Sequence, residues 1–216
     1  MSRDILVYRG LYFVTDRGLS RKSVVEDVTS AISAGVKIVQ YREKELGFDE
    51  QVGEARELRR VTKEKGVLLI INDDVEIALE VEADGVHIGQ DDTSYAEARK
   101  VLGSGKIIGV TVHNVSEAVL AEKMGADYLG VSPIFDTTTK LDAGKGSGVE
   151  LIQRVKKAVR LPIIAIGGIN YNNLEEVMGA GADGAVAMSA IIAKDDVSAE
   201  CKKFIEMMQN DNTWKS

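Results

Sequence analysis

Three short stretches of the chain place charged or amide side chains directly after apolar residues. They are Val39-Gln40-Tyr41-Arg42-Glu43-Lys44, Ile71-Asn72-Asp73-Asp74 and His87-Ile88-Gly89-Gln90-Asp91-Asp92. If the first stretch is a strand, the alternation of side chains puts Gln40, Arg42 and Lys44 on one side. Such cations are typical of an anion site, and the carboxylates of the other stretches are ligands that Mg²⁺ prefers. The combination predicts a phosphorylated substrate that is held partly through a divalent metal.

The two acidic stretches differ in how well a structural role explains them. Asp73 and Glu76 have the spacing of a capping box, so helix capping explains the first stretch as well as metal binding does. Asp92 is the better metal candidate, because Ser94 and Glu97 already provide the capping box of the next helix. This assignment leaves Asp92 without a structural task.

The cysteine and histidine content excludes a zinc site, since one cysteine and two distant histidines cannot form a tetrahedral ligand set. His87 lies within an apolar run and is typical of a packed, hydrogen-bonded histidine. His113 ends another apolar run, where it could line a binding site. We interpret Cys201 as a small core residue of an amphipathic helix.

A stretch between residues 135 and 148 has no periodicity, which in a compact domain indicates a functional loop or disorder. It contains three threonines and a lysine followed by glycines, namely Thr137, Thr138, Thr139, Lys140, Gly144, Gly146 and Gly148. This composition is typical of an anion-binding loop with hinges. The Gly-x-x-x-x-Gly-Lys-Ser/Thr pattern is missing, so nucleoside triphosphate binding is not indicated.

Apolar runs and amphipathic stretches alternate along the chain and predict strands and helices in turn. The predicted strands are 11–16, 36–40, 67–71, 85–89, 107–112, 128–132, 163–166 and 184–188. The predicted helices are 23–34, 49–64, 75–81, 95–102, 116–124, 149–159, 172–179 and 198–208. This α/β pattern predicts a parallel sheet closed into a single (β/α)8 TIM barrel. An open doubly wound sheet is the alternative, but the turn after the first strand lacks its glycine-rich fingerprint.

A weak internal repeat supports the barrel. Glu82-Ala83-Asp84, Gly125-Ala126-Asp127 and Gly181-Ala182-Asp183 each lie between a predicted helix and the next strand. We interpret each as a helix C-cap followed by a tight turn, so their recurrence indicates a repeated βα unit. In a barrel the chemistry lies at the C-terminal ends of the strands, where the three charged stretches fall.

The last two predicted strands end in small residues that suit phosphate binding. Gly167-Gly168 follows one of them, and Met188-Ser189 closes the other. Loops at these positions of a barrel commonly hold a phosphate through backbone N–H groups. A tight turn alone would explain either loop, but the two together favour phosphate.

The composition is that of an ordinary globular protein of 216 residues, 44% of them hydrophobic. Two prolines and no linker predict one domain over residues 1–216, with a short tail from about 209. A net charge of −7 argues against a nucleic-acid or membrane surface and leaves small phosphorylated molecules as the expected partners. No signal or membrane-spanning stretch is seen, so we expect a cytoplasmic location. The oligomeric state stays open, and a homo-oligomer is one of the alternatives.

Together these motifs resemble the thiamine phosphate synthase family from Tyr12 to Ile191. The markers are Gln40-x-Arg42-x-Lys44, Asn72-Asp73-Asp74, His87-x-Gly89-Gln90-x-Asp92, Thr137-Thr138-Thr139-Lys140, Ala165-Ile166-Gly167-Gly168 and Met188-Ser189. The resemblance implies a barrel enzyme that joins 4-amino-5-hydroxymethyl-2-methylpyrimidine diphosphate to a thiazole phosphate, plain or carboxylated. The products would be thiamine phosphate and diphosphate, and the implied cofactor is Mg²⁺.

The resemblance also implies roles for individual residues. Those implied at the pyrimidine diphosphate are Gln40, Arg42, Lys44, Asn72, Thr111 and Lys140, and those at the metal are Asp73 and Asp92. Those implied at the thiazole phosphate are Thr137, Thr139, Gly168, Met188 and Ser189. We expect Arg42, Lys44 and Lys140 to be catalytic. Tyr41, Glu43 and Thr138 lie within the same motifs and join the candidate substrate-binding residues.

Three other functions stay open at this point. A thiazole tautomerase or regulator-like barrel would bind the thiazole phosphate without needing the full set of cations and carboxylates. A phosphate-ligand sensor on the same scaffold would have no activity. An aldolase or isomerase would need a Schiff-base lysine or a Glu/His pair, and Lys44, the candidate lysine at a strand end, has Arg42 beside it, which suits an anion better.

Overall fold

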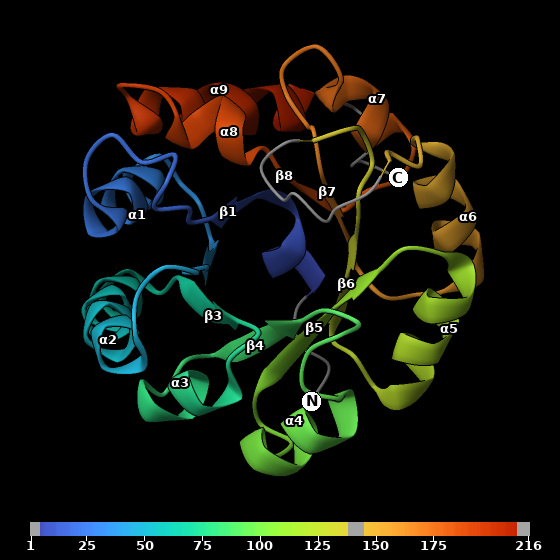
Figure 1. The fold of residues 1–216 in the computed structure, drawn as a ribbon. Helices are drawn as coiled ribbons and strands as arrows, with labels where there is room; N and C mark the ends of the chain where they lie inside the picture. The colour runs from blue at the N-terminus through green and yellow to red at the C-terminus, as the bar shows by residue number, and fades with distance from the viewer. Residues whose placement is uncertain (1–4, 138–144, 211–216) are drawn as a thin grey trace.

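The computed structural model describes residues 5–137 and 145–210, which form a closed barrel of parallel strands in chain order, each paired with its sequence neighbours (Figure 1). The strands are β1 Gly10–Val14, β2 Ile38–Tyr41, β3 Leu68–Asn72, β4 Gly85–Ile88, β5 Ile107–Val112, β6 Tyr128–Val131, β7 Ile163–Ile166 and β8 Gly184–Val186. The pairing of β8 with β1 closes the ring through Leu11 and Ala185. The predicted (β/α)8 barrel is therefore confirmed.

Helices surround the barrel on the outside (Figure 1). They are α1 Val24–Ser33, α2 Phe48–Lys65, α3 Val75–Glu80, α4 Tyr95–Leu102, α5 Val115–Met124, α6 Glu150–Ala158, α7 Leu174–Gly179, α8 Met188–Ile192 and α9 Val197–Asn210, with a short 3₁₀ helix η1 at Ile5–Tyr8. The sequence prediction was wrong at the last strand, which ends at Val186 and not at 188. Ala187 turns the chain out of the sheet, and Met188 begins the short α8.

The alternation of side chains along each strand divides the apolar residues between two cores. The core inside the barrel contains Tyr8, Tyr12, Val14, Ile38, Ile70, Ile107, Tyr128, Ile164 and Val186. A larger core lies between the strands and the helices and takes the outward residues, such as Val39 and Tyr41 of β2. Gln40 therefore points inward with Ile38, as the alternation predicts, and is only 4% exposed.

The repeated acidic turn stabilises the N-terminal ends of the strands. In each copy the aspartate accepts the N–H of the first or second residue of the preceding strand and pairs with a basic side chain of an outer helix. The three sets are Asp84 with Leu69 and Arg59, Asp127 with Ile108 and Arg99, and Asp183 with Ile163 and Lys156. The repeat is thus a structural device of the βα unit.

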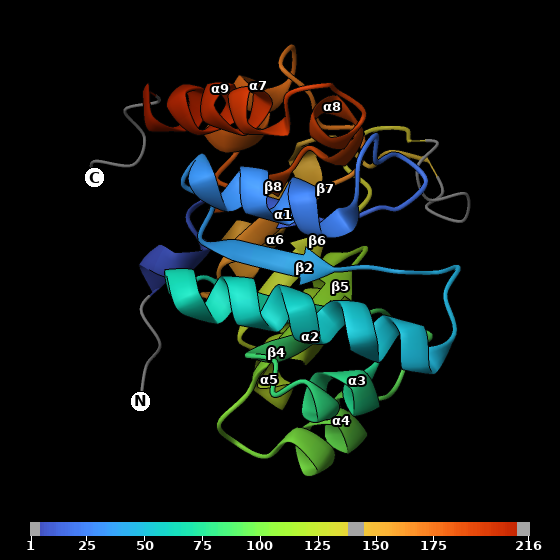
Figure 2. The ribbon, with the colours of Figure 1, turned by 90° about the vertical axis from the view of Figure 1, so that its left-hand side faces the viewer.

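The two ends of the barrel differ (Figure 2). The short helix η1 lies at the end where the strands begin, and the loops that follow the strands gather at the opposite end. Tyr8 of η1 is buried with the inner core and helps to fill the first end. We call the opposite end the mouth. Within the described residues, no helix is long and apolar enough to span a membrane.

Candidate active site

The first cation of the mouth, Arg42, is fixed by residues that follow β1. Thr15 Oγ1 accepts the Arg42 N–H at 2.8 Å and donates to the Arg42 carbonyl at 3.0 Å. The guanidinium Nη1 donates to Asp16 Oδ2 at 2.9 Å. The Arg42 side chain is 20% exposed, so a positioned cation retains access to the mouth.

A tight turn after β3 presents the Asp73 carboxylate. The Asp74 N–H donates to the Asn72 carbonyl at 2.7 Å, which closes a three-residue turn around Asp73 at a φ of +62°. A positive φ is uncommon for a residue other than glycine, and strain of this kind gathers at functional sites. The N-cap of α3 is Asp74, whose side chain accepts the Ile77 N–H at 2.9 Å. The Asp73 carboxylate is therefore not the cap of α3.

Asp73 joins the ends of three neighbouring strands. Its Oδ2 accepts from Lys44 Nζ, which follows β2, at 2.7 Å, and its side chain is within hydrogen-bonding distance of Asp92, which follows β4. Partial desolvation and the Asp73 carboxylate raise the pKa of Asp92, while the Gly89 N–H and the Lys44 ammonium act against them. Two adjacent carboxylates with this repulsion are suited to share a cation.

The expectation that Asp92 has no structural task was wrong. Its Oδ2 accepts the Gly89 N–H at 2.7 Å, which folds the turn after β4. A Cβ on Gly89 would lie 2.7 Å from the same oxygen, so glycine is needed for this contact. The turn fixes the position of one Asp92 oxygen beside Asp73.

The side chains of Tyr41 and Glu43 are engaged in contacts within the protein, and their place among the substrate-binding residues stays a prediction. The Tyr41 hydroxyl donates to Glu54 of α2 at 2.8 Å. Glu43 is 8% exposed, accepts from Arg17 Nε at 2.6 Å, and accepts the N–H groups of Lys44 and Glu45 at 2.8 and 2.7 Å. Both side chains hold the loop that carries Arg42 and Lys44.

A chain of hydrogen bonds runs through the barrel interior beneath the mouth. Gln40 Nε2 donates to Tyr12 OH at 3.1 Å, and the hydroxyls of Tyr12 and Tyr128 are 2.7 Å apart. Tyr128 OH lies 2.9 Å from His87 Nδ1, and His87 Nε2 lies 2.8 Å from Thr111 Oγ1. His87 is thus a packed, hydrogen-bonded histidine, as its sequence context predicts.

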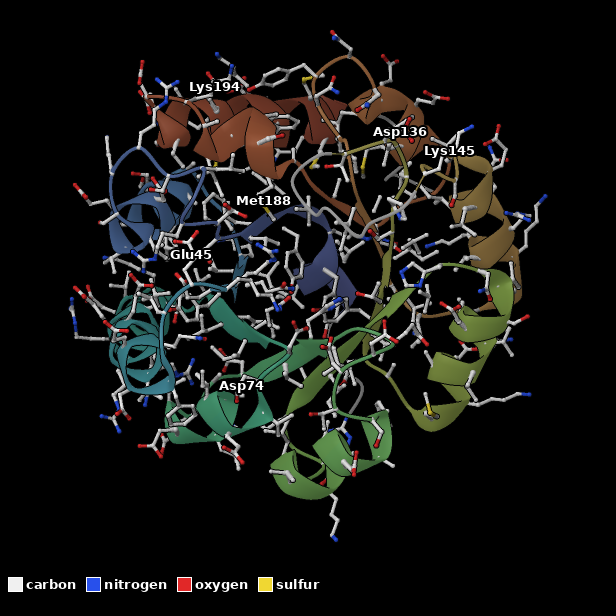
Figure 3. All side chains as sticks on the ribbon, in the orientation of Figure 1. Glu45, Asp74, Asp136, Lys145, Met188 and Lys194 are labelled. Atoms are coloured by element: carbon white, nitrogen blue, oxygen red, sulfur yellow. The ribbon has the colours of Figure 1, made fainter. Side chains whose placement is uncertain are left out.

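The remaining predicted residues follow β6, β7 and β8. Gly168 has a φ of +65° and lies against the loop after β6. A Cβ added to Gly168 would be 2.7 Å from the Asp136 carbonyl oxygen. Met188 and Ser189 begin α8, and in Figure 3 Met188 lies at the inner side of the ring while Lys194 lies at its outer side. Thr137 ends the first described range, and Thr138, Thr139 and Lys140 lie outside the described residues.

A family model described as thiamine monophosphate synthase matches residues 11–191. The chain belongs to the thiamine monophosphate synthase family. The thiamine-phosphate synthase of Methanosarcina barkeri is 52% identical over 198 residues, which cover 92% of this chain and 90% of that protein. The thiamine-phosphate synthase of Chloroflexus aurantiacus is 50% identical over 197 residues and covers 89% of each chain.

A solved structure agrees with this membership of the thiamine monophosphate synthase family. A thiamine phosphate pyrophosphorylase from Pyrococcus furiosus superposes with a TM-score of 0.88 at 35% identity, over 95% of this chain and 98% of that one. The barrel described above is therefore the fold of a solved family member.

For this family member, sequence reasoning missed the side chains that support the mouth. Tyr12 and Tyr128 connect Gln40 to His87, and Thr15 and Asp16 fix Arg42. The strand alternation that places Gln40 inward also places Tyr12 and Tyr128 inward and provides the signal for both. Thr15 and Asp16 follow an apolar strand directly, as the recognised motifs do.

The donors at the mouth fit a divalent cation. Within residues 5–137 and 145–210, no three His, Cys, Asp or Glu side chains gather as a metal cluster. Mg²⁺ commonly takes one or two carboxylates and completes its shell with water and substrate phosphate, so a third acidic side chain is not required. Asp73 and Asp92 form such a pair at the mouth.

Proposed function

We propose that the protein couples 4-amino-5-hydroxymethyl-2-methylpyrimidine diphosphate with 4-methyl-5-(2-phosphoethyl)thiazole to give thiamine phosphate and diphosphate. The observation that carries this proposal is the meeting of Arg42, Lys44, Asp73 and Asp92 at one mouth, in a chain 52% identical to a thiamine-phosphate synthase. Such a set of cations and carboxylates suits a diphosphate, and a barrel that only binds the thiazole phosphate would not require it. The carboxylated thiazole is a further candidate substrate.

The chemistry requires stabilisation of a leaving group and no protein nucleophile. The methylene carbon of the aminopyrimidine can lose diphosphate to give a resonance-stabilised cation, which the thiazole nitrogen then attacks. Arg42 and Lys44 would bind the diphosphate oxygens as negative charge develops on them. Lys140, outside the described residues, is proposed for the same role.

Asp73 and Asp92 are the residues that would hold Mg²⁺. When bound, the ion would neutralise charge on the departing diphosphate. The Asp73 turn and the Gly89–Asp92 bond fix the two carboxylates, and Lys44 bonds to one of them. This arrangement couples the position of the lysine to that of the metal ligands. Asn72, at the base of the same turn, would contact the pyrimidine diphosphate.

The thiazole phosphate would lie on the other side of the mouth. Loops after β7 and β8 of a barrel frequently hold a phosphate through backbone N–H groups, often with a short extra helix. Gly168 lies in the loop after β7, and Ser189 lies in the first turn of α8, a short helix that follows β8. Thr137, Thr138, Thr139 and Met188 are proposed to complete this subsite. Anchoring by the phosphate would hold the thiazole nitrogen towards the reacting carbon.

Diphosphate release by the purified protein tests the proposal. We expect release only when the pyrimidine diphosphate, the thiazole phosphate and Mg²⁺ are all present. Each substrate alone and a reaction with chelator serve as controls. If the protein binds thiazole phosphate but releases no diphosphate, the tautomerase or sensor function takes the place of the coupling reaction.

A further inference from the structure

The buried hydrogen-bond chain from Gln40 to Thr111 has a direction. An amide nitrogen only donates, so Gln40 Nε2 gives a proton to the Tyr12 hydroxyl at 3.1 Å. Burial raises the pKa of Tyr12 and of Tyr128, so each keeps the single proton of its hydroxyl. Tyr12 then donates to Tyr128, and Tyr128 donates to His87 Nδ1. If either tyrosine donated in the other direction, one buried hydroxyl proton of this hydrogen-bond chain would have no acceptor, which is unfavourable.

The direction determines which ring nitrogen of His87 carries the proton. Because Nδ1 accepts from Tyr128, the neutral ring is protonated at Nε2 and donates to Thr111 Oγ1 at 2.8 Å. The hydroxyl proton of Thr111 is then directed to another acceptor. Thr111 is partly exposed near the C-terminal end of β5, so that acceptor can be a ligand in the mouth.

The donor and acceptor roles at the two ends of the hydrogen-bond chain, Gln40 and Thr111, depend on each other. With Gln40 Nε2 on Tyr12, the Gln40 amide oxygen is left as an acceptor on β2, and the Thr111 hydroxyl is left as a donor on β5. Rotation of the Gln40 amide would reverse every hydrogen bond, and the two ends would then be an amide donor and a hydroxyl acceptor. A 4-aminopyrimidine carries an amino N–H donor and ring-nitrogen acceptors, which match the first combination.

Two glycines make room for the chain inside the barrel. A Cβ on Gly109 of β5 would lie 2.1 Å from the Tyr128 ring, and one on Gly130 of β6 would lie 2.8 Å from His87 Cε1. Gly109 is in register with His87 on one side and Tyr128 on the other. Both rings therefore occupy space that a larger side chain on these strands would fill. A tightly enclosed chain keeps its partners and its direction.

We infer that Tyr12, Tyr128 and His87 are positioning residues that hold Gln40 as an acceptor and Thr111 as a donor for the aminopyrimidine ring. They act through Gln40 and Thr111 and do not touch the substrate. The inference rests on the proposed function, since the aminopyrimidine is the substrate proposed above. The tautomer of His87, however, follows from the orientation of the Gln40 amide and needs no substrate.

The first test measures that tautomer by ¹⁵N NMR of protein labelled at histidine. The chain has two histidines, so a His113→Gln variant assigns the signals. We expect a pyrrole-type Nε2–H and a pyridine-type Nδ1 for His87 at neutral pH in the wild-type protein. Protonation at Nδ1, alone or together with Nε2, would overturn the inferred direction. This measurement needs no substrate, so it stands apart from the proposed function.

The second test couples Tyr128 to Thr111. Tyr128→Phe keeps the ring but removes the hydroxyl, and we expect about a tenfold weaker binding of the pyrimidine diphosphate, with unchanged binding of the thiazole phosphate, by calorimetry. In a Thr111→Val background the same change should have a clearly smaller effect, because only the part that acts through Gln40 is left. Thr111→Ser should restore the tenfold response.

Independent, additive losses in the double variant would show a merely structural role and overturn the inference. Tyr12→Phe provides the same test if Tyr128→Phe does not fold, since it breaks the chain one step earlier. Binding is measured without turnover. A protein that binds the pyrimidine diphosphate with the expected coupling but does not join the substrates would therefore contradict the proposed function and leave this inference standing.

Discussion

Thr15 and Arg42 are joined by two hydrogen bonds in opposite directions. The threonine hydroxyl accepts the backbone N–H of Arg42 at 2.8 Å and donates to its carbonyl at 3.0 Å. The link bridges the ends of β1 and β2 just where the chain leaves the sheet, and Thr15 is only 1% exposed. It fixes the backbone from which the Arg42 guanidinium enters the mouth.

Thr15→Val is expected to destabilise the protein and to weaken the substrate site. Valine keeps the shape but leaves the Arg42 N–H and carbonyl without this partner, at a cost of about 1–3 kcal/mol in the free energy of unfolding. We also expect a KM for the pyrimidine diphosphate that rises severalfold, because Arg42 loses its support. Urea unfolding and steady-state kinetics check the two effects. Thr15→Ser is the control, and a comparable loss in that variant would contradict the role of the hydroxyl.

Removal of the Arg42 or Lys44 side chain is expected to lower turnover strongly. If they stabilise charge on the leaving diphosphate, Arg42→Ala and Lys44→Ala should each reduce kcat by about 10²- to 10³-fold, as loss of a preorganised donor does elsewhere. Unfolding curves should stay close to the wild type. Arg56→Ala is the matched control, because Arg56 pairs with Glu80 on the outer helices. Near-normal turnover in both mouth variants would rule out these roles.

Periodicity and spacing predicted most of the fold and the strand ends that carry charge. Eight alternating units gave the barrel, and the period of two along β2 placed Gln40 inward. These features are local, because a strand or a helix imposes its repeat on nearby residues. The end of β8 at Val186 was missed, since a helical turn and a strand end with small residues share one composition.

Contacts between distant residues were beyond the sequence. The Gln40–Tyr12–Tyr128 connection joins three strands and depends on the register of the closed barrel. The positive φ of Asp73, which transfers the helix cap to Asp74, depends on the Asp73 N–H bond to the His87 carbonyl of the next strand. A capping pattern read from spacing alone cannot distinguish two adjacent aspartates.

Loss of either carboxylate of the Asp73–Asp92 pair is expected to raise the Mg²⁺ requirement. Asp73→Asn and Asp92→Asn should each increase the Mg²⁺ concentration for half-maximal diphosphate release at least tenfold, because an amide oxygen is a weaker ligand than a carboxylate. Excess Mg²⁺ should restore part of the rate. A titration of activity against Mg²⁺ measures this, with Asp195→Asn, 89% exposed beside Arg21, as the control. An unchanged midpoint in both site variants would place the metal elsewhere.

Protonation of Glu43 is expected to make the protein less stable in acid. Burial raises its pKa, but the N–H groups of Glu45 and Lys44 and the Arg17 guanidinium together bring the pKa below its usual value. A lowered folded-state pKa adds stability that is complete above the unfolded pKa and is lost as pH falls through the folded one. Glu43→Gln should therefore be clearly less stable than the wild type at pH 7, and the difference should shrink towards pH 3. A gap that widens in acid by urea unfolding would contradict this sign.

Ionisation of Asp27 of α1 is expected to lower the stability of the folded protein, which is opposite to the effect of Glu43. Asp27 is 4% exposed, and burial raises its pKa more than the Ser20 hydrogen bond and Lys22 lower it. A raised folded-state pKa means that the folded protein holds its proton longer, so this group favours folding in acid and opposes it as pH rises past the unfolded pKa of about 4. Asp27→Asn removes the ionisation and should be more stable than the wild type at pH 7, with the gain fading near pH 3. Urea unfolding at both pH values measures the difference. A variant less stable than the wild type at pH 7 would show that the ionised carboxylate stabilises α1 despite its burial.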